Sequence, residues 1–513
     1  MELLGIDRRG FNLGDWRGRL LAIAAAVVIV VAGFILPWAG RFPRTWQWPI
    51  AKTVTAWNKW LAGEIGGITR FLAGLIEAPM SATIAVFAKG ADLQLAGGTF
   101  HVPPLSWLGL VSVIVWLAYR TGGRRLAMVQ TLGCAYLLFF GQWQAAMLTL
   151  SSVVISVPFA IGLGIALGLL CYRMPTLDRW VVTPLMDLMQ TVPAFAYLIP
   201  MLILFGFGPV AAMIATVIFA LPPTARVTTL ALQRVSPEIG ELAAIIGCTR
   251  SQATWRVLIP SAMPMLLVGF NQTVMMTLNM VIIASMIGAG GLGFDVLLAL
   301  RQLNIGRGFE AGTAIVVLAI MLDRQGRVLA SNWSKAGHKT GHGGRAVLGV
   351  VAWLGLTTAL GLWIAPIGTF PQVLQLTTGS VLNDAMSWIN VHFFDAIEAG
   401  RVFVLKHLMN PIRTSLASAP WFIVAGLATL VATLLGGWRL LFLSIFVFGF
   451  CLLAGLWDKA MTTLYLCLAA TIVSVILGLP LAMAGVRWPA FGRVLNVWVE
   501  LLQTMPSFVY LIP

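Results

Sequence analysis

The sequence predicts an all-α polytopic membrane protein built as a tandem parallel repeat, with the second copy incomplete. Of the 513 residues, 59% are hydrophobic and 10% are charged, and the mean hydropathy is +0.91. Soluble globular domains carry about 25% charged residues, so the composition excludes that class. Apolar runs of about 20 residues, the length that crosses a bilayer, recur along the chain. One thirteen-residue stretch also occurs twice.

The first apolar run, at residues 20–36, follows a basic stretch that contains Arg8, Arg9, Arg17 and Arg19. A cleaved signal peptide begins in the same way, but this run is long and no small-x-small cleavage site follows it. We therefore expect an uncleaved signal anchor over 20–40. Further spans are expected at 105–119, 126–141, 149–172, 181–205, 209–224, 264–288, 310–322, 346–366, 421–435, 440–456, 463–485 and from about 496 onward.

The net charge of +15 indicates membrane topology and not a nucleic-acid partner. With the N-terminus inside, alternation of the expected spans places most Lys and Arg residues on cytoplasmic segments. These include a cluster from Arg324 to Arg345. An excess of Lys and Arg on short inner loops is the positive-inside rule. The charge pattern therefore predicts a multi-pass protein with a cytoplasmic N-terminus.

No metal site and no cofactor are expected. The five cysteines have no paired or metal-ligand spacing and suit buried apolar positions. His338 and His342 have the i, i+4 spacing of a metal pair, but their Gly- and Lys-rich surroundings favour a solvated linker. GAGGLG at 288–293 satisfies G-x-G-x-x-G after an apolar helix, where close packing or an outer hinge is preferred to dinucleotide binding. No Gly-Lys dipeptide occurs, so the chain has no Walker A loop.

An internal repeat organises the chain. LMQTVPAFAYLIP at 188–200 returns as LLQTMPSFVYLIP at 501–513, and GQWQAAMLTL at 141–150 aligns with GLWDKAMTTL at 455–464. The second of these registers also pairs Gly122, Gly123, Arg125 and Trp107 with Gly436, Gly437, Arg439 and Trp421. Upstream, Phe42, Pro43 and Trp60 match Phe370, Pro371 and Trp388, after an insertion around 88–101 in the first copy. A register sustained over such lengths indicates a duplicated module.

Module boundaries follow from the repeat. We predict a first module over 1–322 with about eight transmembrane helices, a basic cytoplasmic linker over 323–345 and a second module over 346–513. The repeat is parallel, because matching segments fall on the same side of the membrane. The chain ends partway along an expected span, so we expect a piece of a longer chain whose second copy is truncated here. A true stop, with the first module pairing as a homodimer, is the alternative.

One cytoplasmic segment, SPEIGELAAIIGCTRSQATWRVLIPSAMP at 236–264, carries the clearest signal. Ser236 and Pro237 suit a helix start, and carboxylates follow in the first turns, where they suit the helix dipole. Small residues then offer a surface that another protein can approach closely, and a proline is expected to end the unit. An amphipathic interfacial helix explains these residues equally well. The candidates for such a contact surface, within a loop at 236–260, are Glu241, Ala243, Ala244, Gly247 and Pro260.

The pattern Glu-x-Ala-Ala-x-x-Gly at 241–247, followed by Val257, Ile259 and Pro260, resembles the EAA loop. That loop belongs to permease subunits of bacterial binding-protein-dependent ABC importers. Glu-Leu-Ala-Ala stands here where Glu-Ala-Ala is the commonest form. The flanking QTVPAFAYLIP and FALPPTARVTTLALQRVSPE resemble permeases of the glycine betaine/proline/choline type. The similarity covers about 145–324 and returns over 455–513.

The resemblance implies a transmembrane subunit of an ATP-driven importer in the bacterial inner membrane, and not an enzyme. The loop would dock as a coupling helix on a separate cytoplasmic ABC ATPase dimer. A periplasmic binding protein would deliver a quaternary ammonium or zwitterionic solute: glycine betaine, choline, carnitine, proline or trimethylamine N-oxide. A secondary transporter or channel is the alternative, but its paired midplane charges are nearly absent from the expected spans. A structural or signalling membrane subunit is a third possibility.

Polar residues within spans are candidates for the translocation path. The proline of Gln-Thr-x-Pro breaks helical bonding, which membranes tolerate in protein interiors or beside a watery path. A tyrosine face attracts a quaternary cation by about 0.5–2 kcal/mol. Helix packing and interhelical hydrogen bonds are the alternatives. The candidates are Gln190, Thr191, Pro193, Tyr197, Asn271, Gln272, Thr273, Gln503, Thr504, Pro506 and Tyr510.

Overall fold

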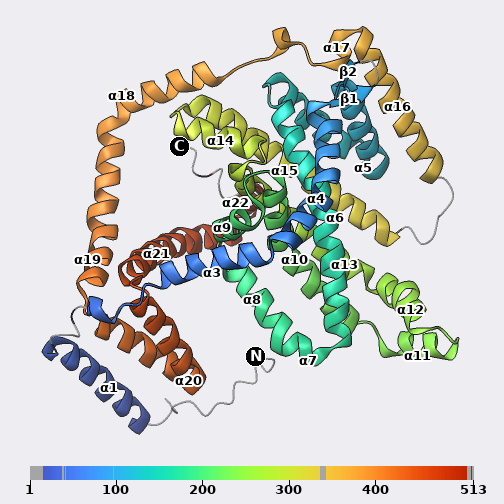
Figure 1. The fold of residues 1–513 in the computed structure, drawn as a ribbon. Helices are drawn as coiled ribbons and strands as arrows, with labels where there is room; N and C mark the ends of the chain where they lie inside the picture. Colours follow the sequence, from blue (N-terminus) through green and yellow to red (C-terminus); the bar gives the residue numbers. More distant parts are fainter. Residues whose placement is uncertain are drawn as a thin grey trace. The chain divides into compact units, whose positions relative to one another are not determined.

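The structure, a computed structural model, describes residues 16–36, 40, 42–95, 98–335, 343–504 and 510. Its regular elements are helices apart from one β-hairpin (Figure 1). Up to the coupling loop they are α1 (Trp16–Ile35), η2 (Arg44–Trp46), α3 (Ile50–Glu64), α4 (Gly66–Ile84), η3 (Ala85–Lys89), β1 (Ala91–Leu95), β2 (Gly98–Val102), α5 (Trp107–Phe139), α6 (Trp143–Arg173), α7 (Pro175–Leu177), η4 (Asp178–Val182), α8 (Thr183–Thr191), α9 (Ala194–Phe205) and α10 (Pro209–Gln233).

From Pro237 onward the elements are also helical. They are α11 (Pro237–Ile245), α12 (Arg250–Gln252), η5 (Ala253–Leu258), α13 (Ile259–Ala284), η6 (Ser285–Ile287), α14 (Leu292–Arg301), α15 (Ile305–Lys335), α16 (Gly343–Trp363), α17 (Ala365–Gly368), η7 (Gln372–Leu374), α18 (Gly379–Val404), η8 (Leu405–Met409), α19 (Asn410–Ser418), α20 (Trp421–Leu453), α21 (Trp457–Arg487) and α22 (Pro489–Thr504).

Contacts divide the chain into two compact units. Unit 1 comprises Met1–Trp60 and Ile389–Asn496, and unit 2 comprises Leu61–Trp388 and Val497–Pro513. In unit 1, α1 packs against α20 and α19 packs against α21. In unit 2, α10 packs against both α6 and α13, and α15 packs against α5 and α14. The units therefore do not follow the two sequence copies, since each combines the beginning of one copy with the body of the other.

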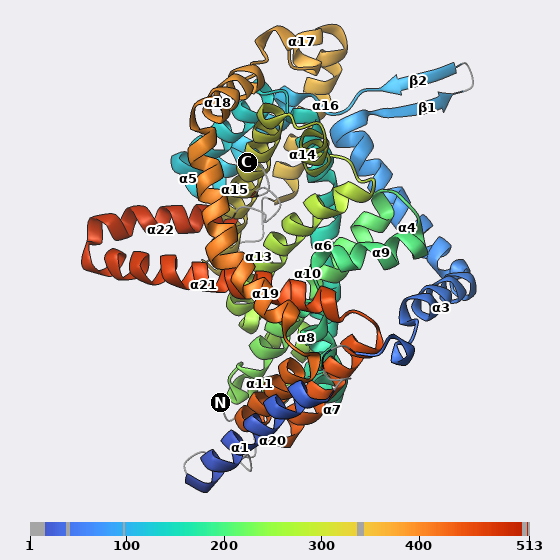
Figure 2. The same ribbon diagram turned by 90° about the vertical axis from the view of Figure 1, so that its left-hand side faces the viewer.

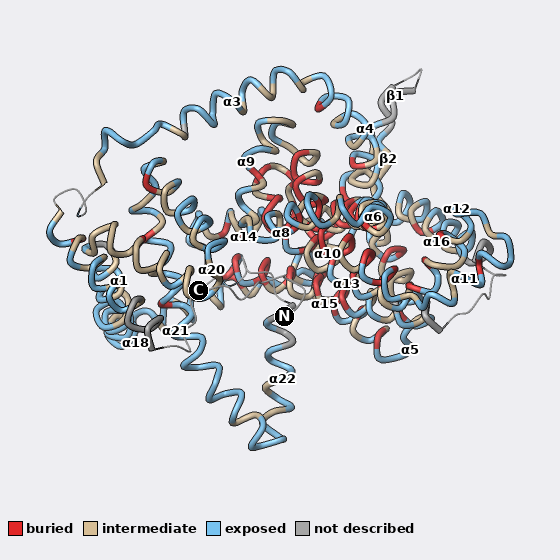
Figure 3. Tube along the Cα trace, turned by 90° about the horizontal axis from the view of Figure 1, so that it is seen from below, coloured by how far each residue is buried: buried red, intermediate tan, exposed pale blue. Residues whose placement is uncertain are grey.

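The core of unit 2 lies where α6, α10, α13 and α15 meet, and buried residues are concentrated there (red in Figure 3). Small residues let α6 approach α10 closely, because a Cβ at Gly168 would lie 2.5 Å from the Thr228 Cβ. The Thr229 hydroxyl donates to the Gly168 carbonyl at 3.1 Å. Small contact residues and hydroxyl bonds of this kind hold helices together where lipid tails provide no hydrophobic drive.

The duplication is visible in the backbone. Helices α5 and α20 each have 33 residues, and α6 and α21 each have 31. Helix α5 is kinked at Gly123, with φ 70° and ψ −163°, and α20 is kinked at Gly437, with φ 68° and ψ −159°. The sequence register had paired these two glycines, and their matching angles confirm the repeat. Positive φ favours glycine because it has no Cβ.

The kinks lie between pairs of expected spans. The spans expected at 105–119 and 126–141 are the two legs of α5, and those at 421–435 and 440–456 are the two legs of α20. Each leg is shorter than the about 20 residues that a perpendicular crossing needs. The short runs were located correctly, and in each pair two helices meet at the glycine.

One apolar helix was missed by the sequence analysis. Seven described helices are long and apolar enough to cross a membrane, and Gly66–Lys89 is one of them. The expected spans had left 41–104 without a crossing. Arg70 and Glu77 lower the hydropathy of this segment, which explains why a search for uncharged runs passed over it. A bent pair, Pro175–Thr191 and Ala194–Phe205, makes eight spans if it is counted as one.

Two connecting segments also differ from expectation. Helix α15 continues to Lys335, so the first part of the expected linker 323–345 is helical. It packs on α5, because Asn332 donates to the Thr121 carbonyl at 2.7 Å and Gln325 to the Thr121 hydroxyl at 3.2 Å. Asp323 and Arg327 pair within α15. His338 and His342 lie outside the described residues. The insertion around 88–101 forms the antiparallel hairpin of β1 and β2, in which Ala91 pairs with Val102 (Figure 2).

The Gly123 kink gives a first prediction. Gly123→Ala should destabilise the protein by about 1–2 kcal/mol, because a Cβ is strained at this φ. Nothing lies within 4 Å of the added Cβ, so the effect is conformational and not steric. Thermal unfolding in detergent measures it. Gly162→Ala is the matched control: it lies in the regular part of α6, also with open space, and should be neutral or stabilising. Equal melting temperatures for wild type and Gly123→Ala would contradict the assignment.

Candidate functional site

The repeated Gln-Thr-x-Pro stretch forms a break between two helices. Helix α8 ends at Thr191 and α9 begins at Ala194, and the pair is bent by 105° (Figure 1). Val192 and Pro193 between them are extended, with ψ of 127° and 141°. Gln190, Thr191 and Pro193 are exposed at the bend. The span expected over 181–205 is therefore a broken helix, and its polar residues lie at the break.

Tyr197 satisfies a backbone carbonyl that the proline leaves without its usual donor. In an α-helix the N–H of residue 193 would donate to the carbonyl of Met189, but proline has no N–H. The Tyr197 hydroxyl donates to this Met189 carbonyl instead. Its ring packs edge-on against Phe219 of α10, with ring centroids 5.7 Å apart. These contacts give Tyr197 a structural role at the break, while its predicted contact with a cation remains untested.

The second copy repeats the tyrosine contact. The Tyr510 hydroxyl donates to the Leu502 carbonyl at 2.5 Å, and Tyr510 and Leu502 align with Tyr197 and Met189 in the repeat. The residue four positions after Leu502 is again a proline, Pro506, which lies outside the described residues. Gln503 and Thr504 are the last two residues of α22. The structure describes no side-chain contacts for them.

An ion pair ties α8 to α10. Arg226 of α10 donates through its guanidinium group to the Asp187 carboxylate, four residues before the end of α8. The two side chains are partly exposed, so the pair contributes about 0–1 kcal/mol. The ion pair mainly positions α8, the helix that leads into the break, against α10. Glu500, the match of Asp187 in the second copy, has no described side chain.

The three consecutive candidates on α13 do not share one environment. Successive helical residues point in different directions, at 3.6 residues per turn. Thr273 is fully buried, and its hydroxyl lies 2.6 Å from that of Thr224 on α10. Asn271 and Gln272 instead line a pocket of about 540 Å³ between α13 and α15, with Arg327 and Ser331. The Asn271 Oδ1 is buried there with no hydrogen-bond partner among the described residues. None of the α8 candidates lines this pocket.

The predicted coupling loop is a compact helix–turn–helix unit. Helix α11 begins with Pro237 after Ser236 and carries Glu238 in its first turn, as expected. It ends at Ile245, and Gly247 two residues later has a left-handed φ of 79°. Gly247 donates to the Ala244 carbonyl and Cys248 to that of Ala243, each at 3.0 Å. This is the glycine-ended helix stop known as the Schellman motif. Thr249 and Gln252 then form a capping box that starts the next helix.

The surface of the loop differs from the expected stripe of small residues. Ala243 is only 2% exposed, because it faces the rest of the loop, where α11 packs on η5. Ala244, Gly247 and Glu241 are exposed. Beside them, Ile245 and Ile246 are 82% and 70% exposed, and Leu242 is exposed as well. The sequence analysis missed these aliphatic residues, although three of them in a loop expected to be cytoplasmic were a usable signal for a docking surface.

Pro260 does not end the unit as predicted. Helical structure runs without interruption from Arg250 to Ile287, and Pro260 is the second residue of α13 within it. The wide π-type turn η5 directly precedes the proline. Such a turn shifts the hydrogen-bond pattern, so the missing N–H of proline can be accommodated without a break. The loop is therefore joined rigidly to the helix that carries Asn271, Gln272 and Thr273.

The glycine run at 288–293 allows neighbouring helices to pack closely. A Cβ at Gly293 would lie 2.3 Å from the Ile282 carbonyl oxygen, and one at Gly291 would lie 2.5 Å from the Thr149 hydroxyl. The Leu292 N–H donates to the same Thr149 hydroxyl at 3.0 Å. The run therefore joins α14 to α6 and α13, in agreement with the packing role preferred from the sequence.

Comparisons with known proteins match this architecture. The family model of the binding-protein-dependent transport system inner membrane component matches residues 160–334, which contain the broken helix and the loop. The trimethylamine N-oxide transport system permease protein TmoV of Ruegeria pomeroyi is 31% identical, over 96% of this chain and 76% of its own length. The glycine betaine permease OpuAB of Bacillus subtilis is 36% identical, over 55% of this chain and 94% of its own. ProW of Escherichia coli, a glycine betaine/proline betaine permease, is 39% identical over 42% of this chain and 61% of its own length.

The family model covers the first copy, whereas the match to TmoV extends over both copies. Members of this family work with a separate ATPase and a substrate-binding protein, and the helices described here suit a multi-pass protein of the inner membrane. The chain belongs to the permease subunits of binding-protein-dependent ABC importers, of the glycine betaine and trimethylamine N-oxide type.

Proposed function

We propose that this chain imports a small methylated amine without net charge, with trimethylamine N-oxide as the first candidate. The observation that carries this proposal is the similarity to TmoV along nearly the whole chain, both copies included. The chemistry of the candidate path supports it. Gln190, Thr191, Asn271 and Gln272 offer amides and hydroxyls, and the Arg327 charge beside Asn271 and Gln272 is paired with Asp323. Such groups suit a dipolar N-oxide or a betaine better than the choline cation, which would call for a carboxylate or an aromatic cage.

The exposed face of α11 is the proposed docking surface for the ATPase dimer. Leu242, Ile245 and Ile246 form an apolar patch beside the Glu241 carboxylate, and Gly247 adds no side chain to it. An exposed aliphatic cluster on a short, internally packed helix favours a protein partner. ATP would be bound and hydrolysed on that partner, since this chain has no Walker A loop.

Movement of the loop would reach the path through packed helices. The continuous helix from Arg250 to Ile287 joins the loop to α13. Thr273 of α13 lies against Thr224 of α10, and Arg226 of α10 pairs with Asp187 of α8. A displacement imposed by the ATPase on α11 would therefore be passed from α13 to α10 and on to the broken helix. Coupling requires such a set of physically linked elements with two arrangements.

This proposal also fixes the sides of the membrane. The loop is cytoplasmic, and the arginines before α1 favour a cytoplasmic N-terminus. If α4 lies along the membrane surface and the other expected spans cross it, the loop and the N-terminus are both cytoplasmic. If α4 also crosses the membrane while the loop stays cytoplasmic, the N-terminus lies outside. A phosphatase reporter fused to the N-terminus distinguishes the two topologies, because it is active only outside the cytoplasm.

Uptake of labelled solutes tests the proposed substrate class. The chain is expressed with the ATPase and binding protein encoded beside it, in cells that lack their own methylated-amine importers. Trimethylamine N-oxide uptake should depend on ATP and on all three proteins. Unlabelled glycine betaine should compete more strongly than choline, because it has no net charge. Choline uptake without trimethylamine N-oxide uptake would overturn the substrate proposal.

Gly247→Trp should abolish ATPase binding and uptake while the protein remains inserted in the membrane. No described residue lies within 4 Å of a Cβ at Gly247, so the bulk of Trp is expected to obstruct a partner. Co-purification of the ATPase and uptake are the measurements. Gly247→Asn is the control for backbone strain, because Asn tolerates positive φ, and it should retain most of the binding. Normal uptake by Gly247→Trp, or equal loss in both variants, would contradict the docking surface.

Thr191→Trp should block uptake while ATPase binding and membrane expression survive, because the indole would fill the path at the break. Leu185→Trp is the matched control on the same helix. Leu185 is also exposed, but lies away from the break, and its replacement should leave uptake near wild type. Uptake, ATPase binding and membrane level are measured together in both variants. A parallel fall of all three in Thr191→Trp would show a structural role only.

A further inference from the structure

Each copy begins with a segment that we call its arm. Arm 1 comprises residues 16–50, which include α1, and arm 2 comprises residues 343–378, which include α16 and α17. In unit 2, arm 2 packs on α5, which belongs to the first copy. In unit 1, arm 1 packs on α20, which belongs to the second copy. Both pairings can be followed in Figure 1, within each unit. Each arm thus lies on the kinked helix of the other copy.

The two contacts are equivalent, residue by residue. In unit 2 the rings of Trp107 and Phe370 meet edge-on, with centroids 5.2 Å apart and an interplanar angle of 86°. In unit 1 the rings of Trp421 and Phe42 meet edge-on at 5.3 Å and 86°. The repeat aligns Trp107 with Trp421 and Phe42 with Phe370. One aromatic pair is therefore made twice, each time between different copies.

Backbone hydrogen bonds repeat the same pattern. The Leu376 N–H of arm 2 donates to the Phe139 carbonyl at the end of α5, at 2.6 Å. The Trp48 N–H of arm 1 donates to the Leu453 carbonyl at the end of α20, at 2.7 Å. In the repeat, Trp48 aligns with Leu376 and Phe139 with Leu453. These bonds satisfy helix-end carbonyls that have no donor within their own helix.

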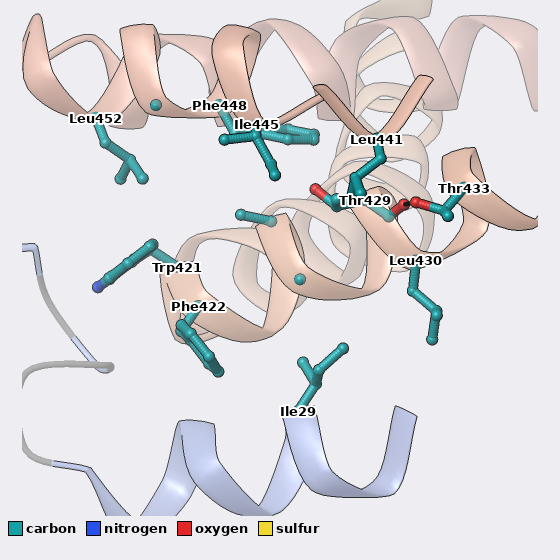
Figure 4. A pocket seen from close by; sticks show the side chains of 13 residues that line it. Ile29, Trp421, Phe422, Thr429, Leu430, Thr433, Leu441, Ile445, Phe448 and Leu452 are labelled. Atoms are coloured by element: carbon teal, nitrogen blue, oxygen red, sulfur yellow. Dashed lines mark hydrogen bonds between the residues drawn. The ribbon is translucent and has the colours of Figure 1, made fainter. Parts of the chain in front are cut away.

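The arm helices also approach their partners at small residues. A Cβ at Gly109 of α5 would lie 3.2 Å from the Thr357 Cβ of α16. A Cβ at Gly426 of α20 would lie 2.7 Å from the Ile29 side chain of α1. In Figure 4, Ile29 points from α1 toward a pocket of about 470 Å³ lined by both legs of α20. Thr357 and Ile29 occupy the same position in the repeat.

Polar contacts hold arm 2 in addition. Trp353 donates through its indole N–H to the Ser112 hydroxyl at 2.7 Å, and Trp107 donates in the same way to the Pro366 carbonyl at 3.0 Å. The end of the arm is fixed by Glu310 of α15, which is 5% exposed. Its carboxylate accepts from the Thr378 N–H at 2.6 Å. This carboxylate caps the start of α18, where the helix dipole favours negative charge.

We propose that the two copies assemble by reciprocal exchange of their arms, each arm serving as a docking segment for the kinked helix of the other copy. Residues that align in the repeat make the same contacts in both units. The repeated sequence therefore accounts for both sets of contacts. The first copy therefore has the second copy as its binding partner. Because the two copies are linked in one chain, the effective concentration of the partner is high.

Disulfide formation in the full chain tests the exchange. The background variant has all five native cysteines replaced and a protease site placed within 336–342. Gly109→Cys with Thr357→Cys is the exchanged pair. The 3.2 Å separation of their Cβ positions is near the about 3.5–4.5 Å of a disulfide. Gly109→Cys with Ile29→Cys is the matched control, because Ile29 holds the position of Thr357 within the same copy. Ile29→Cys with Gly426→Cys tests the second exchange.

After oxidation in membranes and cleavage of the linker, both exchanged pairs should leave the two halves joined on a non-reducing gel. The control pair lies within one half, so its disulfide is measured as loss of free thiols on oxidation. Loss of free thiols in the exchanged pairs should exceed that in the control at least about tenfold, because a disulfide forms only where Cα atoms approach within about 7 Å. Thiol labelling confirms that every cysteine is accessible and the protein folded. Halves that separate although both thiols react would overturn the proposal. A doubled mass before cleavage would overturn it too, because the disulfide would then join two chains.

Discussion

A backbone carbonyl or N–H inside a bilayer must find a partner within the protein, since lipid tails provide none. This constraint explains why the chain can break a helix at Gln-Thr-x-Pro. Pro193 removes the donor for the Met189 carbonyl, and the Tyr197 hydroxyl replaces it. The second copy applies the same solution between Tyr510 and Leu502. In each copy the tyrosine that lies eight residues after this carbonyl therefore satisfies it. This lowers the energetic cost of breaking the helix within the membrane.

The same constraint governs how the helices are joined. Hydroxyl groups of Thr224, Thr229 and Thr273 bond within or between the helices of the unit 2 core, so that no unpaired donor faces the packed interior at these positions. Close packing through Gly164 and Gly168 brings the backbones near enough for these bonds. A core of this kind deforms little when pushed. A force on the proposed coupling loop is therefore expected to move α13 as a body.

Some features could be predicted because they depend on local residues. Short stretches of sequence were enough to predict the duplication, the matching glycines Gly123 and Gly437, and the proline break. Other features depend on packing that a single sequence does not specify. Ala243 faces inward because α11 packs on η5, and Pro260 continues a helix because a wide turn precedes it. Gly66–Lys89 escaped detection because Arg70 and Glu77 interrupt its apolar run. The Gln503, Thr504 and Pro506 candidates stay predictions, because their side chains are not described.

Arm exchange shows a deeper limit of sequence reasoning. The repeat tells which residue of one copy matches which residue of the other, but Phe42 could pack on Trp107 or on Trp421 with the same chemistry. The sequence pattern is identical for exchanged and unexchanged arms, so only three-dimensional contacts distinguish them. A duplicated chain has a physical reason to exchange. Each interface then joins the two copies, whereas an unexchanged arm would stabilise only its own copy and leave the pair to be held by the remaining surfaces.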